Sequence, residues 1–280
     1  MASDRPIGVF DSGLGGLTVV RALRRHLPGE PLLYLGDTAR VPYGSKSADT
    51  VVRYSRRCAY FLLDRGIKAL LVACNTASAY ALDALRGELS IPLLGAVDPG
   101  ADEAVAATRG GVVGVIGTLG TVRSLSYPRA IRARRPDVQV VQLACPLLVP
   151  LVEEGWLGDG DGAFRGAEER AARLVVERYL RELRQRAPEL DVLVLGCTHY
   201  PLLRPLLAEV AATLWPQAVT LVDSAQAMAR ATARLLAAEG LLGDADPAPL
   251  ACAVTDEARF DEIAPRFLGE RLEAAERVDL

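Results

Sequence analysis

Two short stretches of this chain decide its fold. Residues 67–78 read IKALLVACNTAS, and residues 190–201 read LDVLVLGCTHYP. In each stretch an apolar run of the length of a buried strand ends on a cysteine, and polar residues follow where a helix is expected to begin. A cysteine at that point lies beside the unpaired N–H groups of the first helical turn, which favour a thiolate or a bound carboxylate. Cys74 and Cys197 are therefore the first candidates for a chemical role.

Strand and helix patterns alternate along nearly the whole chain. This alternation is typical of an α/β fold, in which parallel sheets carry helices on both faces. Residues 98–100 (Asp-Pro-Gly) form a boundary signal, after which the alternation restarts, so we predict two similar halves. In the second half we expect one helix over 124–135, a polar glycine-rich stretch at 158–162 and a helix over 163–186. A further strand, at the edge of a sheet, is expected near 251–255.

The composition indicates an ordinary globular protein. The chain has 280 residues, of which 50% are hydrophobic and 24% charged. A net charge of −3 gives no electrostatic reason to expect nucleic acid or an anionic membrane as a partner. The most apolar stretch, 140–152, is too short to span a bilayer, and no apolar signal region begins the chain. The five cysteines have no C-x-x-C spacing, so we expect neither a disulfide framework nor a structural zinc site. A reducing, cytoplasmic location fits this pattern best.

Polar loops follow other predicted strands. Residues 10–16 read FDSGLGG, whose glycine spacing does not fit a dinucleotide fingerprint. We interpret this loop as anion-friendly, with Asp11 either a functional carboxylate or a helix N-cap. The turn at 42–44 (Pro-Tyr-Gly) is either a binding loop or a plain turn. Thr118 and Thr121 follow the strand predicted at 112–116. Ligands of such folds bind beyond the carboxyl ends of the strands, so all these loops are candidates for one site.

Two cysteines on opposite sides of a cleft between the halves could invert a stereogenic carbon beside a carboxylate. A thiolate on one face would remove the proton, and a thiol on the other face would deliver one. A free thiol has a pKa of about 8.5, and a helix N-terminus lowers it. Asp11 would assist Cys74, and His199 would assist Cys197. Nearby hydroxyl groups would offset the negative charge of the site: Ser12, Thr76, Thr118, Thr121 and Thr198.

A hydrolase with a Cys197–His199 pair is the chemical alternative, although it leaves Cys74 without a role. The remaining cysteines are expected to be packing residues, because buried cysteine behaves as a small apolar side chain. They are Cys58, Cys145 and Cys252.

Taken together, these motifs resemble the glutamate racemase family of the cofactor-independent aspartate/glutamate racemase superfamily. The resemblance covers the whole length of the chain. It rests on FDSGLGG at 10–16, GDT at 36–38, PYG at 42–44, ACNTAS at 73–78, GTLGT at 117–121, LGCTHYP at 195–201 and VDS at 222–224, together with Cys145-Pro146 and Val152-Glu153.

The resemblance implies interconversion of L- and D-glutamate, supplying D-glutamate for peptidoglycan, with no cofactor and no metal. It implies that Cys74 is the base for the D-substrate and Cys197 the base for the L-substrate, with Asp11 and His199 as their assistants. The glutamate-binding set that it implies is Asp11, Ser12, Tyr43, Gly44, Asn75, Thr76, Thr118, Thr121, Thr198 and His199.

The resemblance also implies two pseudo-symmetric α/β domains, with the active site in the cleft between them and a homodimer as the assembly. We expect the first domain to comprise 1–98 plus 211–280, with a return crossing near Ala211, and the second to comprise 99–210. An aspartate racemase of the same superfamily is the nearest alternative, differing in pocket length. A non-enzymatic binder is a third, because some members of the family restrain DNA gyrase.

Overall fold

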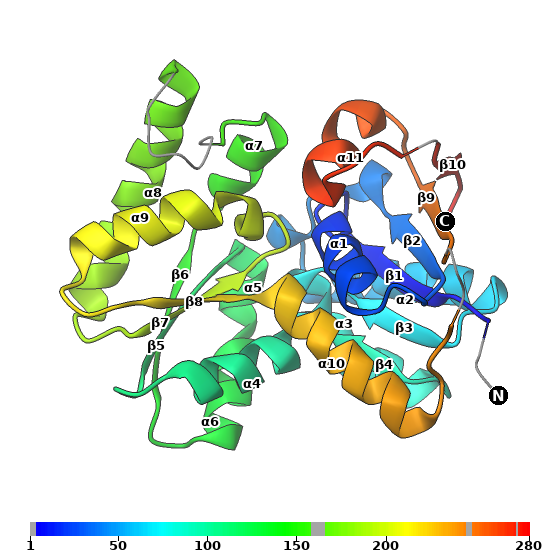
Figure 1. The fold of residues 1–280 in the computed structure, drawn as a ribbon, viewed down its shortest axis with the longest axis horizontal. Coiled ribbons are helices and arrows are strands. Elements are labelled where there is room, and N and C mark those ends of the chain that lie inside the picture. Colours follow the sequence, from blue (N-terminus) through cyan, green and yellow to red (C-terminus); the bar gives the residue numbers. More distant parts are fainter. Residues whose placement is uncertain (1–3, 158–165, 245–247, 273) are drawn as a thin grey trace. The chain divides into compact units, whose positions relative to one another are not determined.

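The computed structural model describes residues 4–157, 166–244, 248–272 and 274–280. It divides into two compact units. The first unit runs to Ala96 and resumes at Ala225–Leu280, and the second is Val97–Ser224. Each unit has its own parallel sheet, so the predicted α/β class with two parallel-sheet domains is confirmed (Figure 1).

The first unit has a six-stranded sheet in the order β10-β9-β2-β1-β3-β4, with every pair parallel. Its strands are β1 (Ile7–Asp11), β2 (Leu32–Gly36), β3 (Ala69–Val72), β4 (Leu93–Gly95), β9 (Leu250–Val254) and β10 (Glu276–Arg277). Its helices are α1 (Leu17–His26), α2 (Ala48–Asp64), α3 (Asn75–Glu88), α10 (Ser224–Glu239) and α11 (Phe260–Leu268), with short 3₁₀ turns at Thr38–Arg40 and Tyr43–Ser45.

The core of this unit follows from helical spacing. Val51, Cys58 and Leu62 recur on one face of α2 and are fully buried, as expected of an amphipathic helix on a sheet. They pack in one apolar cluster with Phe10 and Val72 from the central strands. This packing fixes the positions at which β1 and β3 end, and therefore the loops that follow them.

The second unit has a four-stranded parallel sheet in the order β6-β5-β7-β8. Its strands are β5 (Val112–Gly117), β6 (Gln139–Ala144), β7 (Val192–Gly196) and β8 (Thr220–Asp223). Its helices are α4 (Val97–Ala107), α5 (Leu119–Ser124), α6 (Ser126–Arg134), α7 (Leu148–Glu153), α8 (Ala167–Arg186) and α9 (Arg204–Leu214), with a 3₁₀ turn at Tyr200–Leu203. Helix α4 packs against β7 and β8, and α8 packs against β6 and α9.

The predicted return crossing near Ala211 is wrong. Strand β8 pairs with β7, with Leu221 opposite Leu193, so the chain remains in the second sheet as far as Asp223. The return to the first unit falls between Ser224 and Ala225. A pairing partner 28 residues away in sequence decides this boundary, and hydropathy along the chain does not report it.

Three local predictions are also corrected. The two units divide between Ala96 and Val97, close to the predicted boundary at 98–100, but these three residues form no separate turn. They lie inside the first turn of α4, where proline is tolerated because N–H groups there have no helical partner. The helix predicted over 124–135 is two helices, α5 and α6, separated by Leu125 in the left-handed conformation at φ 56°. The Ser124 hydroxyl ends α5 by donating to the Thr121 carbonyl at 2.6 Å and accepting the Ser126 N–H at 3.1 Å.

The strand predicted at the edge near 251–255 is β9, which lies between β2 and β10. The glycine-rich stretch at 158–162 and the predicted helix start at 163 lie outside the described residues. Within the described ranges, no helix is long and apolar enough to cross a membrane.

Candidate active site

Three loops of the first unit meet at the carboxyl edge of its sheet. Strands β1, β2 and β3 are neighbours, with Asp11 opposite Gly36 and Phe10 opposite Val72. The residues that follow these strands therefore lie together. Asp11 is fully buried, and its Oδ2 accepts the Gly13 N–H at 3.0 Å. A Cβ on Gly16 would lie 2.5 Å from the Asp11 Cβ, so only glycine allows the chain to pass this close to the carboxylate.

Cys74 is the N-cap of α3. Its Sγ accepts the Ala77 N–H at 3.4 Å, and its thiol also lies 3.5 Å from the Ser12 hydroxyl oxygen. The predicted position of this cysteine, at the point where a strand gives way to a helix, is confirmed. The N–H groups and dipole of a 14-residue helix favour negative charge on the sulfur. Cys74 is buried, with 6% of the residue exposed.

Asn75 and Thr76 form the first turn of α3 and are nearly fully buried beside Cys74. Tyr43 belongs to the glutamate-binding set that the resemblance implies, but its phenol is directed into the first unit. Its ring is buried, and its hydroxyl donates to Asp37 Oδ2 at 2.5 Å. Burial, followed by the effects of the nearby Cys58 thiol and Asp37 carboxylate, raises the pKa of Tyr43 far above its ordinary value. Gly44 is half-buried, so the backbone of this turn, rather than the Tyr43 hydroxyl, is the part available to contact a ligand.

The second unit presents a matching edge. Strands β5 and β7 are neighbours with Gly117 opposite Gly196, so Thr118 and Cys197 follow adjacent strand ends. The Thr118 hydroxyl accepts the Thr121 N–H at 3.2 Å and lies 3.1 Å from the Thr121 hydroxyl. A Cβ on Gly196 would lie 2.8 Å from the Ile116 carbonyl oxygen, which explains the glycine that precedes the cysteine.

Cys197, His199 and Glu153 form a connected triad. His199 Nδ1 lies 3.9 Å from Cys197 Sγ and 3.4 Å from the Thr198 hydroxyl. On the other side of the ring, His199 Nε2 lies 2.9 Å from Glu153 Oε1 at the end of α7. Glu153 was not among the predicted site residues, although Val152-Glu153 is one of the matching motifs. Nothing in the local pattern shows that it meets a histidine 46 positions away.

The triad keeps His199 protonated. Burial of the ring works against the charged form, but the hydrogen bonds to Cys197 and Glu153 outweigh it, together with the charge of the Glu153 carboxylate and of Cys197 when it is a thiolate. Together they raise the pKa of His199 to about 10. At neutral pH an imidazolium therefore faces the Cys197 sulfur and offers it a counter-charge and a proton.

The other cysteines have the environment of packing residues. All five thiols are free and buried. Burial raises the pKa of Cys252 to about 12, and raises the pKa of Cys58 and of Cys145 further above the ordinary range. None of these three sulfurs caps a described helix of eight residues or more, in contrast to Cys74.

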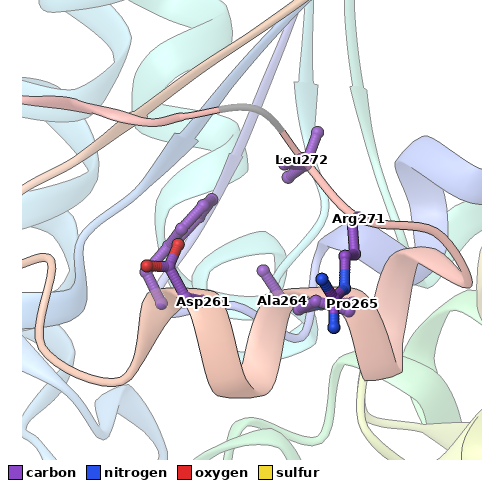
Figure 2. Close-up of a pocket in the computed structure, with 6 residues that line it drawn as sticks. Asp261, Ala264, Pro265, Arg271 and Leu272 are labelled. Atoms are coloured by element: carbon purple, nitrogen blue, oxygen red, sulfur yellow. The ribbon is translucent and has the colours of Figure 1, made fainter.

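In the part of the chain that the structure describes, no group of three His, Cys, Asp or Glu side chains could hold a metal ion. A hollow of about 410 Å³ lies beside α11 and the segment after it, lined by Asp261, Arg271 and apolar neighbours (Figure 2). None of its lining residues belongs to the predicted site.

Comparison with known proteins identifies the family. The family described as Asp/Glu/Hydantoin racemase matches residues 16–232. The chain belongs to this racemase family. Racemases are isomerases, and the resemblance inferred from the motifs is confirmed.

Relatives of this racemase family member cover nearly its whole length. A glutamate racemase of Syntrophus aciditrophicus is 49% identical, covering 98% of this chain and 97% of its own. The crystal structure of a glutamate racemase isoform from Bacillus anthracis has a TM-score of 0.89 at 36% identity, covering 99% of this chain and 98% of its own. A Francisella tularensis glutamate racemase, solved in complex with D-glutamate, has a TM-score of 0.87 at 33% identity, covering 99% of this chain and 98% of its own.

Proposed function

We propose that this racemase interconverts L- and D-glutamate by proton transfer at the α-carbon, with Cys74 and Cys197 as two bases that act on opposite faces. The observation that carries the proposal is the matched support of two thiols. Cys74 caps the start of α3, and Cys197 faces the His199 imidazolium. Two such groups allow inversion, because a single base fixed on one face would return the proton to the face from which it came.

In the D-to-L direction the Cys74 thiolate would take the α-proton. The C–H bond breaks, an S–H bond forms, and the electron pair stays on the α-carbon and its carboxylate. The Cys197 thiol then gives its proton to the opposite face and becomes a thiolate, which His199 stabilises as a counter-ion. The L-to-D direction uses the same steps with the cysteines exchanged. No electrons are gained or lost overall.

The remaining predicted residues would bind and orient the substrate. Two carboxylates need N–H and hydroxyl donors, which the two sheet edges provide in Ser12, the Gly44 backbone, Asn75, Thr76, Thr118, Thr121 and Thr198. The buried Asp11 carboxylate would attract the substrate ammonium group and support proton removal by Cys74. Tyr43 would act through its turn, because its hydroxyl is engaged by Asp37.

Glutamate, rather than aspartate, is supported by the full-length relatives that carry the name glutamate racemase and by the relative solved with D-glutamate. We further propose that the product D-glutamate serves peptidoglycan synthesis in the cytoplasm. A homodimer is the expected assembly, and light scattering at the concentration used for kinetics tests it.

Deuterium wash-in at the α-carbon of L- and D-glutamate in D₂O tests the proposal. We expect the wild type to exchange and invert both enantiomers without added cofactor. Cys74→Ser should exchange only L-glutamate, and Cys197→Ser only D-glutamate, each without inversion. Cys252→Ser is the matched control, since this thiol is also buried and free, and should behave as wild type.

Three outcomes would overturn parts of this proposal. Exchange with aspartate alone would move the substrate to the shorter amino acid. Full inversion by either cysteine variant would refute the two-base mechanism. Absence of exchange with both amino acids would refute racemisation, and an acyl-enzyme burst with an ester would then indicate a hydrolase built on Cys197 and His199.

A further inference from the structure

The last five residues dock on the first unit beside the loop that carries Tyr43. Strand β10 pairs in parallel with β9, and Figure 1 shows it alongside β9 with the C-terminal end close by. The Val278 N–H donates to the Val254 carbonyl at 2.9 Å, and the Val278 side chain is buried. Leu280 packs against the same apolar cluster that contains Tyr43. The segment 276–280 is therefore part of the folded unit.

Three arginines hold this segment. Arg65 binds the Glu276 carboxylate through two parallel contacts of 2.7 and 2.8 Å. Arg57 Nη1 donates to the Leu280 main-chain oxygen at 3.0 Å. Arg40 Nη2 donates to the same oxygen through a short hydrogen bond.

Arg40 differs from the other two because it also reaches the predicted substrate loop. Its Nη1 lies 3.5 Å from Asp37 Oδ2, the oxygen that accepts the Tyr43 hydroxyl at 2.5 Å. Its guanidinium lies 5.0 Å from the centroid of the Tyr54 ring, which in turn lies 5.8 Å from the Tyr43 ring. The guanidinium therefore connects the docked segment to Asp37 and Tyr54, the two side chains that contact Tyr43.

Charge explains why this link matters. Asp37 is fully buried, and a buried carboxylate is costly unless a cation and hydrogen bonds compensate it. The Thr255 hydroxyl donates to its Oδ1 at 3.0 Å, and Arg40 supplies a charge on the Oδ2 side. The Arg40 side chain is 18% exposed, and the Leu280 oxygen is one of the acceptors that keep it in this place.

We infer that Arg40 is a positioning residue for substrate binding, through which the docked segment 276–280 holds the Asp37–Tyr43 pair and thereby the Tyr43-Gly44 turn. The inference rests on the proposed function, in which that turn binds glutamate. Arg40 is not one of the residues that the resemblance places against glutamate, so its loss should weaken binding much more than proton transfer.

Two variants test the link: Arg40→Ala, and a chain that ends at Val278, which keeps β10 but lacks both the oxygen and the apolar side chain of Leu280. For each, we expect KM to rise about tenfold for both enantiomers and kcat to change less than about threefold. Because Arg40 transmits the effect, the shortened chain in the Arg40→Ala background should show no additional rise in KM. Arg40→Lys should have a KM between those of wild type and Arg40→Ala. Lysine returns the positive charge, but it lacks the two guanidinium nitrogens that contact Asp37 and Leu280 at once.

Arg57→Ala is the matched control. It removes a contact to the same Leu280 oxygen but leaves the Arg40–Asp37 contact, so KM should stay within about twofold of wild type. Hydrogen exchange of a peptide covering 37–46 gives a readout that needs no substrate. We expect faster exchange there in Arg40→Ala and in the shortened chain, and no change in Arg57→Ala.

The outcomes separate this inference from the proposed function. Unchanged exchange in the 37–46 peptide overturns the link, whatever the substrate. Faster exchange with an unchanged KM overturns the positioning role. A lower melting temperature with additive effects on KM in the double variant also overturns it, because the tail would then act on stability alone. A wild type that neither binds nor converts glutamate would refute the proposed function, and the exchange data would still decide the link.

Discussion

Replacing Glu153 with glutamine should lower the pKa of His199 and shift the pH dependence of catalysis. The carboxylate lies 2.9 Å from Nε2 and is one of the two partners that raise the pKa of His199 to about 10, the other being Cys197. Glutamine keeps a hydrogen-bonding group but removes the charge. Burial then opposes protonation more effectively, and we expect the pKa to fall toward the ordinary value of about 6.5, while Cys197 still acts to raise it.

The sign of the effect follows from the protonation state that is needed. If the imidazolium assists Cys197, activity is present below the pKa of His199 and lost above it. In Glu153→Gln the alkaline limb should therefore begin well below pH 10, and kcat/KM at pH 8 should fall by up to about 30-fold, the loss that a pKa of about 6.5 would produce. The fall must be equal for both enantiomers, because L- and D-glutamate have the same free energy and the equilibrium constant is unity.

Stability should respond in the same pH window. The folded-state pKa is above the unfolded value, so the charged His199 stabilises the fold fully below about pH 6.5 and loses this contribution as pH rises through about 10. At about 1.4 kcal/mol per pKa unit, the contribution is on the order of a few kcal/mol. Glu153→Gln should flatten this dependence in urea unfolding measured between pH 6 and 10.

NMR titration measures the pKa directly. The chain has two histidines, and His26→Gln assigns the remaining signal to His199. His26 interacts with Gln226 at an exposed position, so its replacement should leave activity unchanged. A wild-type His199 that titrates at or below 6.5 would refute the reasoning, as would a Glu153→Gln variant that retains both the pKa and the pH profile of the wild type.

Two further predictions concern close packing and buried charge. Gly16→Ala should destabilise the fold by about 1–3 kcal/mol and lower kcat/KM, because its Cβ would lie 2.5 Å from the Asp11 Cβ; urea unfolding and racemisation assays measure this. Gly87→Ala on α3, which has open space around the new methyl group, should instead be neutral or stabilising by up to about 1 kcal/mol, and equal losses in both variants would contradict the steric argument. Lys68→Met should cost about 3–5 kcal/mol, since it leaves the Glu30 carboxylate, 2.5 Å from Nζ and 1% exposed, without its counter-charge. The double variant Lys68→Met/Glu30→Leu should recover most of that loss in the same unfolding assay, and no recovery would show that packing rather than charge is responsible.

Local patterns in the sequence were sufficient for most of the fold. Buried parallel strands are short apolar runs, and the glycines and polar residues after them mark where each strand ends, so β1, β3, β5 and β7 are predictable from the sequence. The position of Cys74 at the start of α3 follows from the same rule. These features depend on neighbours within one or two turns of chain, and they are therefore readable along the sequence.

Pairings between distant segments could not be read in this way. The sequence contains Glu153, Asp37 and Arg40, but their partners depend on how the strands are ordered and where each helix ends. Arg40 meets Leu280 across 240 positions, and Thr255 meets Asp37 across 218. Strand β8 likewise belongs to the second sheet because its edge pairs with β7.

The sequence by itself therefore determined the parallel α/β class, the family and the places of both cysteines, since these rest on short-range hydrophobic periodicity and turn chemistry. Only the tertiary structure decided which groups act on the other site residues. Glu153 contacts His199, and Asp37 together with Arg40 holds Tyr43 in place. The physical reason is that a buried charge must find its compensating partner in space. That partner is fixed by packing and not by proximity along the chain.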